Sequence, residues 1–155
     1  MVAKTNSMRV LDSLKIAYEV HTFSPEVHSA DEVASILGFL PSEVYKTLVV
    51  MRDKGRPLLV MVGADLELDL KKLAKAVGEK RLRMGTRKEA ESLTRLKVGG
   101  ISALALLSKG FEVLIDQRAL GLESILVSAG QRGINLRLRV DGLIRATGAK
   151  AVEAT

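Results

Sequence analysis

Tyr45-Lys46-Thr47-Leu48-Val49-Val50-Met51 is the stretch that decides the fold of this 155-residue chain. Apart from Lys46 and Thr47 it is apolar, and it is short and rich in β-branched and aromatic side chains, which is typical of a largely buried strand. A lysine is costly to bury there unless its ammonium reaches water, a carboxylate or an anionic ligand. Lys46 is therefore either a snorkelling lysine at a strand end or an ammonium in a cleft that receives an anionic or carbonyl-bearing ligand.

Turn and capping signals around this strand predict the other elements. Asp53-Lys54-Gly55 is a hairpin turn, so residues 58–62 should pair antiparallel with the central strand. Two segments, Ser29-Ala30-Asp31-Glu32 and Thr86-Arg87-Lys88-Glu89, have the pattern of capping boxes. We expect further helices with N-caps at Asn6 or Ser7, at Asp69 and at Asp141, and further strands over residues 18–23, 81–84, 111–115, 124–127 and 134–140.

Composition bounds the class of protein. The order of elements predicts one α/β domain over residues 1–155, with an antiparallel or mixed sheet of about seven strands surrounded by helices. Aromatic residues make up only 3% and tryptophan is absent, so Leu, Val, Ile and Ala must build the core. With no cysteine and two histidines, the chain offers no disulfide, no thiolate nucleophile and a poor donor set for a structural metal; we expect no cofactor.

The net charge of +6 favours a polyanionic partner such as nucleic acid. Lys4 is followed by a polar segment rather than by the apolar run of a signal peptide, and the longest apolar runs are too short to span a bilayer. We therefore expect a cytoplasmic protein that does not bind membranes. The scarcity of aromatic residues argues against a platform that stacks single-stranded bases.

A glycine-rich segment, Lys97-Val98-Gly99-Gly100-Ile101-Ser102-Ala103, is the second informative stretch. Paired glycines allow positive φ and expose successive backbone N–H groups, which can hold a carboxylate, a phosphate or an oxyanion formed during acyl transfer. A plain turn is the alternative. The spacing of a P-loop or of a dinucleotide fingerprint is missing.

Three further segments could contact a ligand. Ser128 and Gly130 lie at a strand end, where turn chemistry explains them nearly as well. His28 lies in a loop, either solvated or at the lip of a cleft. Alternation places Asn135, Arg137 and Arg139 on one strand face, which is either solvated or a patch that contacts phosphates.

Taken together, these segments resemble a known family. Val44-Tyr45-Lys46-Thr47-Leu48, the Asp69-Leu70-Lys71-Lys72-Leu73 helix start, Val98-Gly99-Gly100-Ile101-Ser102, Ile115-Asp116 and Val127-Ser128-Ala129-Gly130-Gln131-Arg132-Gly133 occur in the order of the YbaK/aminoacyl-tRNA-synthetase-associated domain family. The match runs from about Met8 to Val152. The conjunction of Tyr-Lys-Thr-Leu with Val-Gly-Gly-Ile-Ser is far more specific than either motif alone.

The resemblance implies an α/β fold with a mixed, barrel-like sheet. It also implies trans-editing, which is hydrolysis of the ester that joins a wrong small amino acid, such as alanine or cysteine, to the 3′ end of tRNA for proline. The partners would be the tRNA acceptor end and prolyl-tRNA synthetase. By the same resemblance Lys46, Gly99, Gly100, Ile101 and Ser102 would form the catalytic centre. The expected substrate-binding residues are Tyr45, Thr47, His28, Ala103, Ser128, Gly130 and Asn135.

Two positions depart from the pattern of that family. Its glycine loop usually ends in proline, where this chain has Ala103, and many members have aspartate where it has Asn135. Proline would pre-set the loop conformation, and an amide cannot act as a carboxylate base. Two rival hypotheses therefore remain: a non-catalytic tRNA-binding or synthetase-associated module of the same fold, and a carrier that binds a free amino acid.

Overall fold

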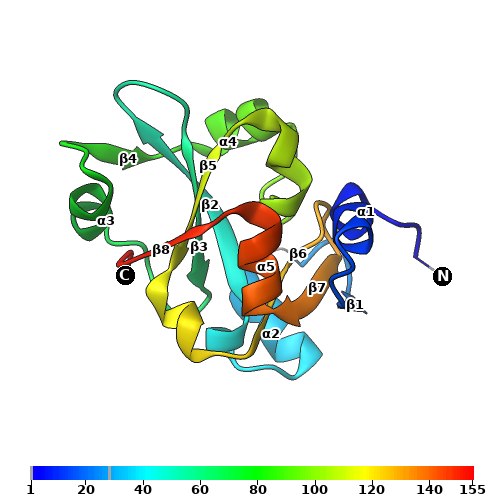
Figure 1. Ribbon diagram of the computed structural model, residues 1–155. Helices are drawn as coiled ribbons and strands as arrows, with labels where there is room; N and C mark the ends of the chain where they lie inside the picture. Colours follow the sequence, from blue (N-terminus) through cyan, green and yellow to red (C-terminus); the bar gives the residue numbers. More distant parts are fainter. Residues whose placement is uncertain (1, 28) are drawn as a thin grey trace.

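Two β-sheets and the helices around them form the molecule. The computed structural model describes residues 2–27 and 29–155 (Figure 1). None of the helices in this described part is long and apolar enough to cross a membrane. The strands are β1 Glu19–Thr22, β2 Tyr45–Arg52, β3 Leu58–Gly63, β4 Leu82–Met84, β5 Glu112–Asp116, β6 Ser124–Ser128, β7 Ile134–Arg139 and β8 Lys150–Val152. The helices are α1 Asn6–Ser13, α2 Ala30–Leu37, α3 Leu70–Val77, α4 Arg87–Thr94 and α5 Val140–Thr147, with 3₁₀ turns η1 Pro41–Glu43, η2 Leu104–Lys109 and η3 Gln117–Gly121.

The strands divide into a five-stranded sheet, in the order β4-β2-β3-β5-β8, and a three-stranded sheet, in the order β1-β7-β6. β2 and β3 pair antiparallel, as the hairpin signal predicts, and β3, β5 and β8 run parallel. One isolated parallel bridge, between Val44 and Leu126, joins the two sheets. The mixed α/β class is confirmed, but the sheets do not close into the expected single barrel-like sheet because this bridge is their one link among the described strands.

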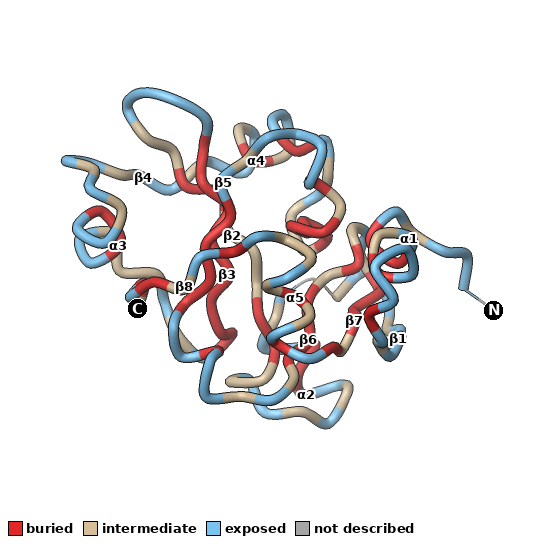
Figure 2. The backbone as a smooth tube through the Cα atoms, in the orientation of Figure 1, coloured by how far each residue is buried: buried red, intermediate tan, exposed pale blue. Residues whose placement is uncertain are grey.

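The core lies on both faces of the five-stranded sheet. Every residue of β3 is buried, as expected for a central strand (Figure 2). On β2, Tyr45 and Val49 belong to the cluster shared with the three-stranded sheet, whereas Val50 faces the cluster under α3. Alternation therefore puts Thr47 on the first face and Lys46 on the second.

The helix caps test the local sequence signals directly. Asp69 accepts hydrogen bonds from the N–H groups of Lys71 and Lys72, and Thr86 with Glu89 forms the predicted capping box. Ser29 is the N-cap of α2, but its side chain makes no capping hydrogen bond. Two expected caps are wrong. Thr5, rather than Asn6 or Ser7, caps α1, because its hydroxyl accepts the Met8 N–H. Asp141 lies within the first turn of α5, whose N-cap is Arg139, and its carboxylate pairs with the Arg139 guanidinium 3.2 Å away.

One edge of β2 is only partly paired. β4 pairs with it from Val50 to Arg52, and the bridge at Val44 lies at its other end. The Gly85 N–H donates to the carbonyl of Val49, 2.9 Å away. Between these contacts residues 45–48 have no strand partner on that edge within the described part of the chain. This gap in pairing is where the cleft described next is found.

Candidate active site

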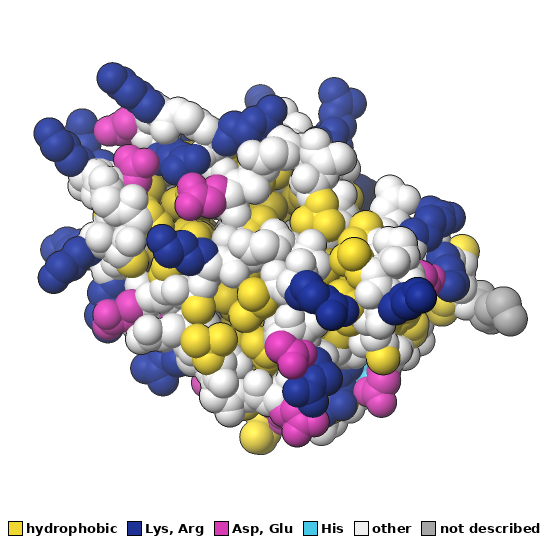
Figure 3. Space-filling view, in the orientation of Figure 1, with side chains coloured by type: hydrophobic (Ala, Val, Ile, Leu, Met, Phe, Trp, Pro, Cys, Tyr) yellow, Lys and Arg dark blue, Asp and Glu magenta, His cyan; other side chains and the backbone are white. Residues whose placement is uncertain are grey.

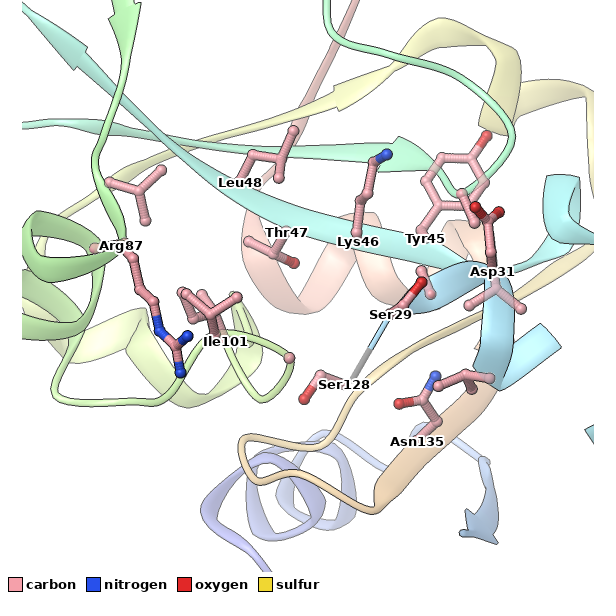
Figure 4. Close-up of a pocket in the computed structure, with 18 of the residues that line it drawn as sticks. Ser29, Asp31, Tyr45, Lys46, Thr47, Leu48, Arg87, Ile101, Ser128 and Asn135 are labelled. Carbon is pink, nitrogen blue, oxygen red and sulfur yellow. The ribbon is translucent and has the colours of Figure 1, made fainter. Parts of the chain in front are cut away.

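A cleft of about 430 Å³ lies along the open edge of β2 (Figure 4). The β2 edge forms its back, the start of α2 one end, and the β4–α4 connection the other end. The loop after α4 and the facing ends of β6 and β7 complete it. The lining residues are Ser29, Ala30, Asp31, Val33, Val44, Tyr45, Lys46, Thr47, Leu48, Val49, Ala64, Met84, Gly85, Arg87, Ala90, Val98, Gly99, Ile101, Ser128 and Asn135.

Lys46 and Thr47 present opposite sides of the strand to this cleft. Figure 4 shows the Thr47 hydroxyl on the side of Ile101 and Ser128, and the Lys46 side chain leaving the strand on the other side. Lys46 is half-buried, and within the described residues its ammonium forms no ion pair or hydrogen bond. The ammonium is thus at the rim of the cleft rather than on its floor, and a ligand that reaches the rim can accept hydrogen bonds from it.

The glycine loop is anchored at Val98, where both the backbone N–H and the backbone carbonyl form hydrogen bonds to side chains. The Glu91 carboxylate accepts the Val98 N–H at 2.8 Å, and the Arg132 side chain donates to the Val98 carbonyl at 2.7 Å. The hydrogen bond from Val98, followed by the charges of Arg87 and Arg132, lowers the pKa of Glu91, so it is a carboxylate at neutral pH. The loop is therefore held against α4 and against the turn after β6.

This anchoring determines which loop N–H groups remain available. Val98 donates to Glu91 and Gly100 donates to the Lys97 carbonyl at 2.7 Å. Gly99, which has a φ of 92°, and Ile101 both line the cleft, and their N–H groups form no hydrogen bond within the described part of the chain. Two backbone donors that point to one position can stabilise an oxyanion there, and these two N–H groups are the candidates that the loop offers.

Four of the predicted site residues lie behind the cleft rather than in its lining. Gly100 is buried, and a Cβ atom there would be 2.9 Å from the backbone nitrogen of Arg132. The Ser102 hydroxyl lies 3.2 Å from that of Ser7 in a buried contact. Ala103 is the N-cap of η2, and a Cβ at Gly130 would meet Ala105 at 3.2 Å. Ser102, Ala103 and the two glycines therefore contribute packing that holds the loop.

Ala103 occupies a backbone conformation that proline would adopt. Its φ is −62° and its ψ is −35°, and its N–H makes no hydrogen bond within the described residues. The departure from the family pattern therefore need not alter the loop. We predict that Ala103→Pro raises the free energy of unfolding by about 0.4–1 kcal/mol, because it restricts the unfolded chain. Denaturant unfolding measures this.

A matched control lies two residues further along. The Ala105 N–H donates to the Ser102 hydroxyl at 3.3 Å, so Ala105→Pro removes a hydrogen bond and should lower stability. If Ala103→Pro were as destabilising as Ala105→Pro, the described loop conformation would be wrong.

Three other predicted residues do line the cleft. Tyr45 is almost fully buried, and burial, followed by the charges of Asp116 and Asp65, raises its pKa to about 12, so its hydroxyl is protonated at neutral pH. The Ser128 hydroxyl accepts the Gly130 N–H at 3.1 Å. Asn135 is 6% exposed, and its amide forms no side-chain hydrogen bond within the described part of the chain. His28 lies outside the described residues.

The predicted face of β7 divides between two environments. Asn135 lines the cleft, whereas Arg137 and Arg139 are not among the lining residues and contact other side chains of the protein. The Arg137 guanidinium lies 5.6 Å from the centre of the Phe39 ring, and Arg139 pairs with Glu123 and Asp141. The arginines of this strand therefore do not extend the cleft.

Sequence patterns missed two charged residues of the cleft. Asp31 and Arg87 each occupy the first turn of a helix, α2 and α4, and their segments were assigned only to capping. Figure 4 places them at opposite ends of the cleft, with Lys46 and Thr47 between them. The Arg87 side chain is 66% exposed, with its Nε 3.6 Å from Glu91. Only the tertiary arrangement of the two helices brings these residues to one site.

Solved structures share this architecture over almost the whole chain. A hypothetical protein superposes with a TM-score of 0.88 at 22% identity, covering 96% of this chain and 98% of the other. A protein described as a candidate trans-editing enzyme for prolyl-tRNA synthetase superposes with a TM-score of 0.80 at 24% identity, with 99% of each chain covered. At these identities the likeness establishes the fold.

Sequence comparison gives relatives at higher identity. A protein of Enterococcus faecalis, named as a candidate Cys-tRNA(Pro)/Cys-tRNA(Cys) deacylase, is 36% identical over 98% of this chain and 93% of its own length. The proline–tRNA ligase of Aquifex aeolicus is 30% identical over 73% of this chain, which corresponds to 19% of the ligase. The profile of the aminoacyl-tRNA editing domain matches residues 24–146. The chain belongs to the aminoacyl-tRNA editing domain family.

Proposed function

We propose that this protein is a trans-editing aminoacyl-tRNA deacylase that hydrolyses the ester of a mischarged small amino acid, alanine or cysteine, on tRNA for proline. One observation carries the proposal: in a chain of this family, the N–H groups of Gly99 and Ile101, unpaired within the described residues, belong to a cleft that Thr47 also lines, with Lys46 at its rim. The relative named for Cys-tRNA(Pro) and Cys-tRNA(Cys) supports the choice of substrate.

The chemistry requires a held substrate and a polarised carbonyl. The N–H groups of Gly99 and Ile101 bind the ester carbonyl oxygen and stabilise the negative charge that forms there. The Lys46 ammonium binds the terminal phosphate or ribose and so fixes the ester in the cleft. Water attacks the carbonyl carbon, the bond to the ribose oxygen breaks, and that oxygen takes up a proton as the free amino acid leaves.

The reaction also needs a group that accepts a proton from the attacking water, and few side chains of the cleft can do this. Asn135 is an amide and cannot accept the proton of the attacking water. The one carboxylate among the lining residues of the described chain is Asp31, at the end of the cleft. We therefore assign activation of the water to the substrate itself, through a ribose hydroxyl, with the protein supplying position and electrostatic stabilisation.

Deacylation of charged tRNA tests this proposal. Purified protein is incubated with Ala-, Cys- and Pro-tRNA for proline, and release of the labelled amino acid is followed against spontaneous hydrolysis. We expect the alanine or cysteine ester to be hydrolysed faster than the proline ester. A folded sample without activity on all three removes the enzymatic proposal.

A second candidate function is a non-catalytic tRNA-binding module that acts together with prolyl-tRNA synthetase. The observation that favours it is the neutral Asn135: among the described lining residues, the interior of the cleft offers no carboxylate or imidazole base. Retention of uncharged tRNA without turnover would favour this candidate. Both candidates place the protein in the cytoplasm, where tRNA is charged.

A further inference from the structure

The charges of this chain are unevenly distributed in sequence. Residues 80–97, here called the basic wall, carry seven lysines and arginines and two glutamates, a net charge of +5 out of +6 for the whole chain. Residues 24–44, here called the acidic wall, carry Glu26, Asp31, Glu32 and Glu43 and no lysine or arginine, a net charge of −4.

These two segments form opposite ends of one cleft. The basic wall contributes Met84, Gly85, Arg87 and Ala90 to the lining, and the acidic wall contributes Ser29, Ala30, Asp31, Val33 and Val44. Figure 4 shows Arg87 at one end and Asp31 at the other. In Figure 3 lysine and arginine side chains project from the upper edge, where β4, the β2–β3 turn and α4 lie in Figure 1. The cleft is therefore polarised along its length.

Helix dipoles do not cancel this polarity. The N-terminus of α2 faces the acidic end and adds about half a positive charge. Asp31 and Glu32 in its first turn carry two full negative charges, so the acidic end remains negative. At the other end, the N-terminus of α4 adds to the positive charge of Arg87, although Glu89 of the capping box offsets part of it.

Asn135 independently indicates that a ligand enters the cleft. Its side chain is more than nine-tenths buried, and within the described residues its amide has no hydrogen-bonding partner. The fully buried side-chain atoms that lack a partner in the described chain belong to Arg132 and Arg137, so the Asn135 amide is open to the space of the cleft. Figure 4 shows it directed into the cleft, below Asp31. A ligand that offers a donor or an acceptor at this end would satisfy it.

We propose that the cleft imposes one orientation on an aminoacylated polynucleotide: the phosphodiester backbone crosses the basic wall, and the cationic α-amino group faces Asp31 on the acidic wall. The substrate class rests on the proposed function, and the orientation follows from the charges. An aminoacyl ester carries phosphates on one side of the scissile bond and an ammonium on the other, so its charges complement those of the cleft.

Binding of uncharged tRNA tests the basic wall without any need for turnover. Lys88 and Lys97 are exposed residues of this wall that form no ion pair within the described chain. We expect the double variant Lys88→Glu/Lys97→Glu to bind tRNA at least tenfold more weakly. The slope of log affinity against log salt should fall by about two, one for each lost phosphate contact.

The matched control lies on α3. Lys71 and Lys75 are also exposed and unpaired within the described chain, and Lys71→Glu/Lys75→Glu changes the net charge by the same amount. The control should retain tRNA affinity within about threefold. Equal losses in both variants would show that net charge alone acts, and undiminished binding by the Lys88→Glu/Lys97→Glu variant would also overturn the proposal. Thermal melts followed by circular dichroism check that each variant is folded. The milder Lys88→Gln/Lys97→Gln variant repeats the binding test without adding negative charge.

A non-hydrolysable analogue tests the acidic wall. The probe is an acceptor-stem oligonucleotide whose 3′ end carries alanine through an amide bond, with the α-amino group either free or acetylated. We expect the protein to bind the free amine about tenfold more tightly, and Asp31→Asn to reduce this ratio to about one. Glu32→Gln, which changes the neighbouring exposed carboxylate outside the lining, should leave the ratio unchanged.

These outcomes are separable from those of the deacylation test. If the protein hydrolyses no ester but shows both charge effects, the proposed reaction fails and the orientation stands. If it hydrolyses esters while Asp31→Asn keeps the full preference for the free amine, the reaction stands and the orientation is wrong.

Discussion

Replacing Lys46 with methionine is expected to lower kcat/KM for deacylation about 10- to 100-fold. A hydrogen bond to a charged group is worth about 1.5–3 kcal/mol, and each 1.4 kcal/mol corresponds to a factor of ten. Methionine keeps the length and the apolar part of the side chain, so the fold should be retained. Because Lys46 has no ion-pair partner within the described residues, its loss leaves no carboxylate of the protein uncompensated.

The control for this prediction is the same substitution at the far end of the hairpin. Lys54 is exposed in the turn between β2 and β3, so Lys54→Met should keep full activity. Cooperative thermal unfolding of both variants would exclude global effects. If the Lys46→Met protein retained full kcat/KM, the active site would not be centred on the β2 edge.

Gly100→Ala should be more damaging to activity than any single change of an exposed residue. The added Cβ would lie 2.9 Å from the Arg132 nitrogen and 3.0 Å from the Gln131 carbonyl carbon, and these backbone atoms cannot rotate away. The loop must move instead, which displaces the N–H groups of Gly99 and Ile101. A misplacement of about 1 Å can cost 10²-fold in rate, and overpacking costs about 1–3 kcal/mol of stability.

Gly121 provides the comparison for this substitution. A Cβ atom added there would have no neighbouring atom within 4 Å, and the residue has no positive φ, so Gly121→Ala tests the change of residue without crowding. We expect near-native activity and stability for it, measured by the same deacylation assay and denaturant titration. Native activity in Gly100→Ala would mean that the loop N–H groups are not part of the catalytic machinery.

The local signals in the sequence predicted the elements well because their causes are local. Asp69 and Thr86 cap their helices through N–H groups two or three residues away, and Gly38 and Gly78 end theirs in the left-handed conformation. The error at Asp141 arose from a competing partner, Arg139. β8 was missed because its three residues are stabilised by parallel pairing with β5, which is distant in sequence.

The site was predictable only in part. The association of Lys46 with the glycine loop came from motifs, and the structure places both on one cleft. It could not be foreseen that Gly100 and Ser102 face the packing behind the loop. Arg87 and Asp31 were also beyond sequence reasoning, because their proximity depends on how two helices distant in sequence are placed. Alternation left the face of Asn135 open between solvent and a ligand patch, and the resemblance made Asn135 a substrate-binding residue; the structure places it, buried, in the lining of the cleft.

The unpaired stretch of β2 also has a consequence for solubility. A strand edge with free backbone groups is a template on which a second chain can add and begin to aggregate. Here the unpaired backbone is recessed between α2 and the β4–α4 connection, which flank it on either side. The walls of the cleft thus protect this strand edge from pairing with a second molecule.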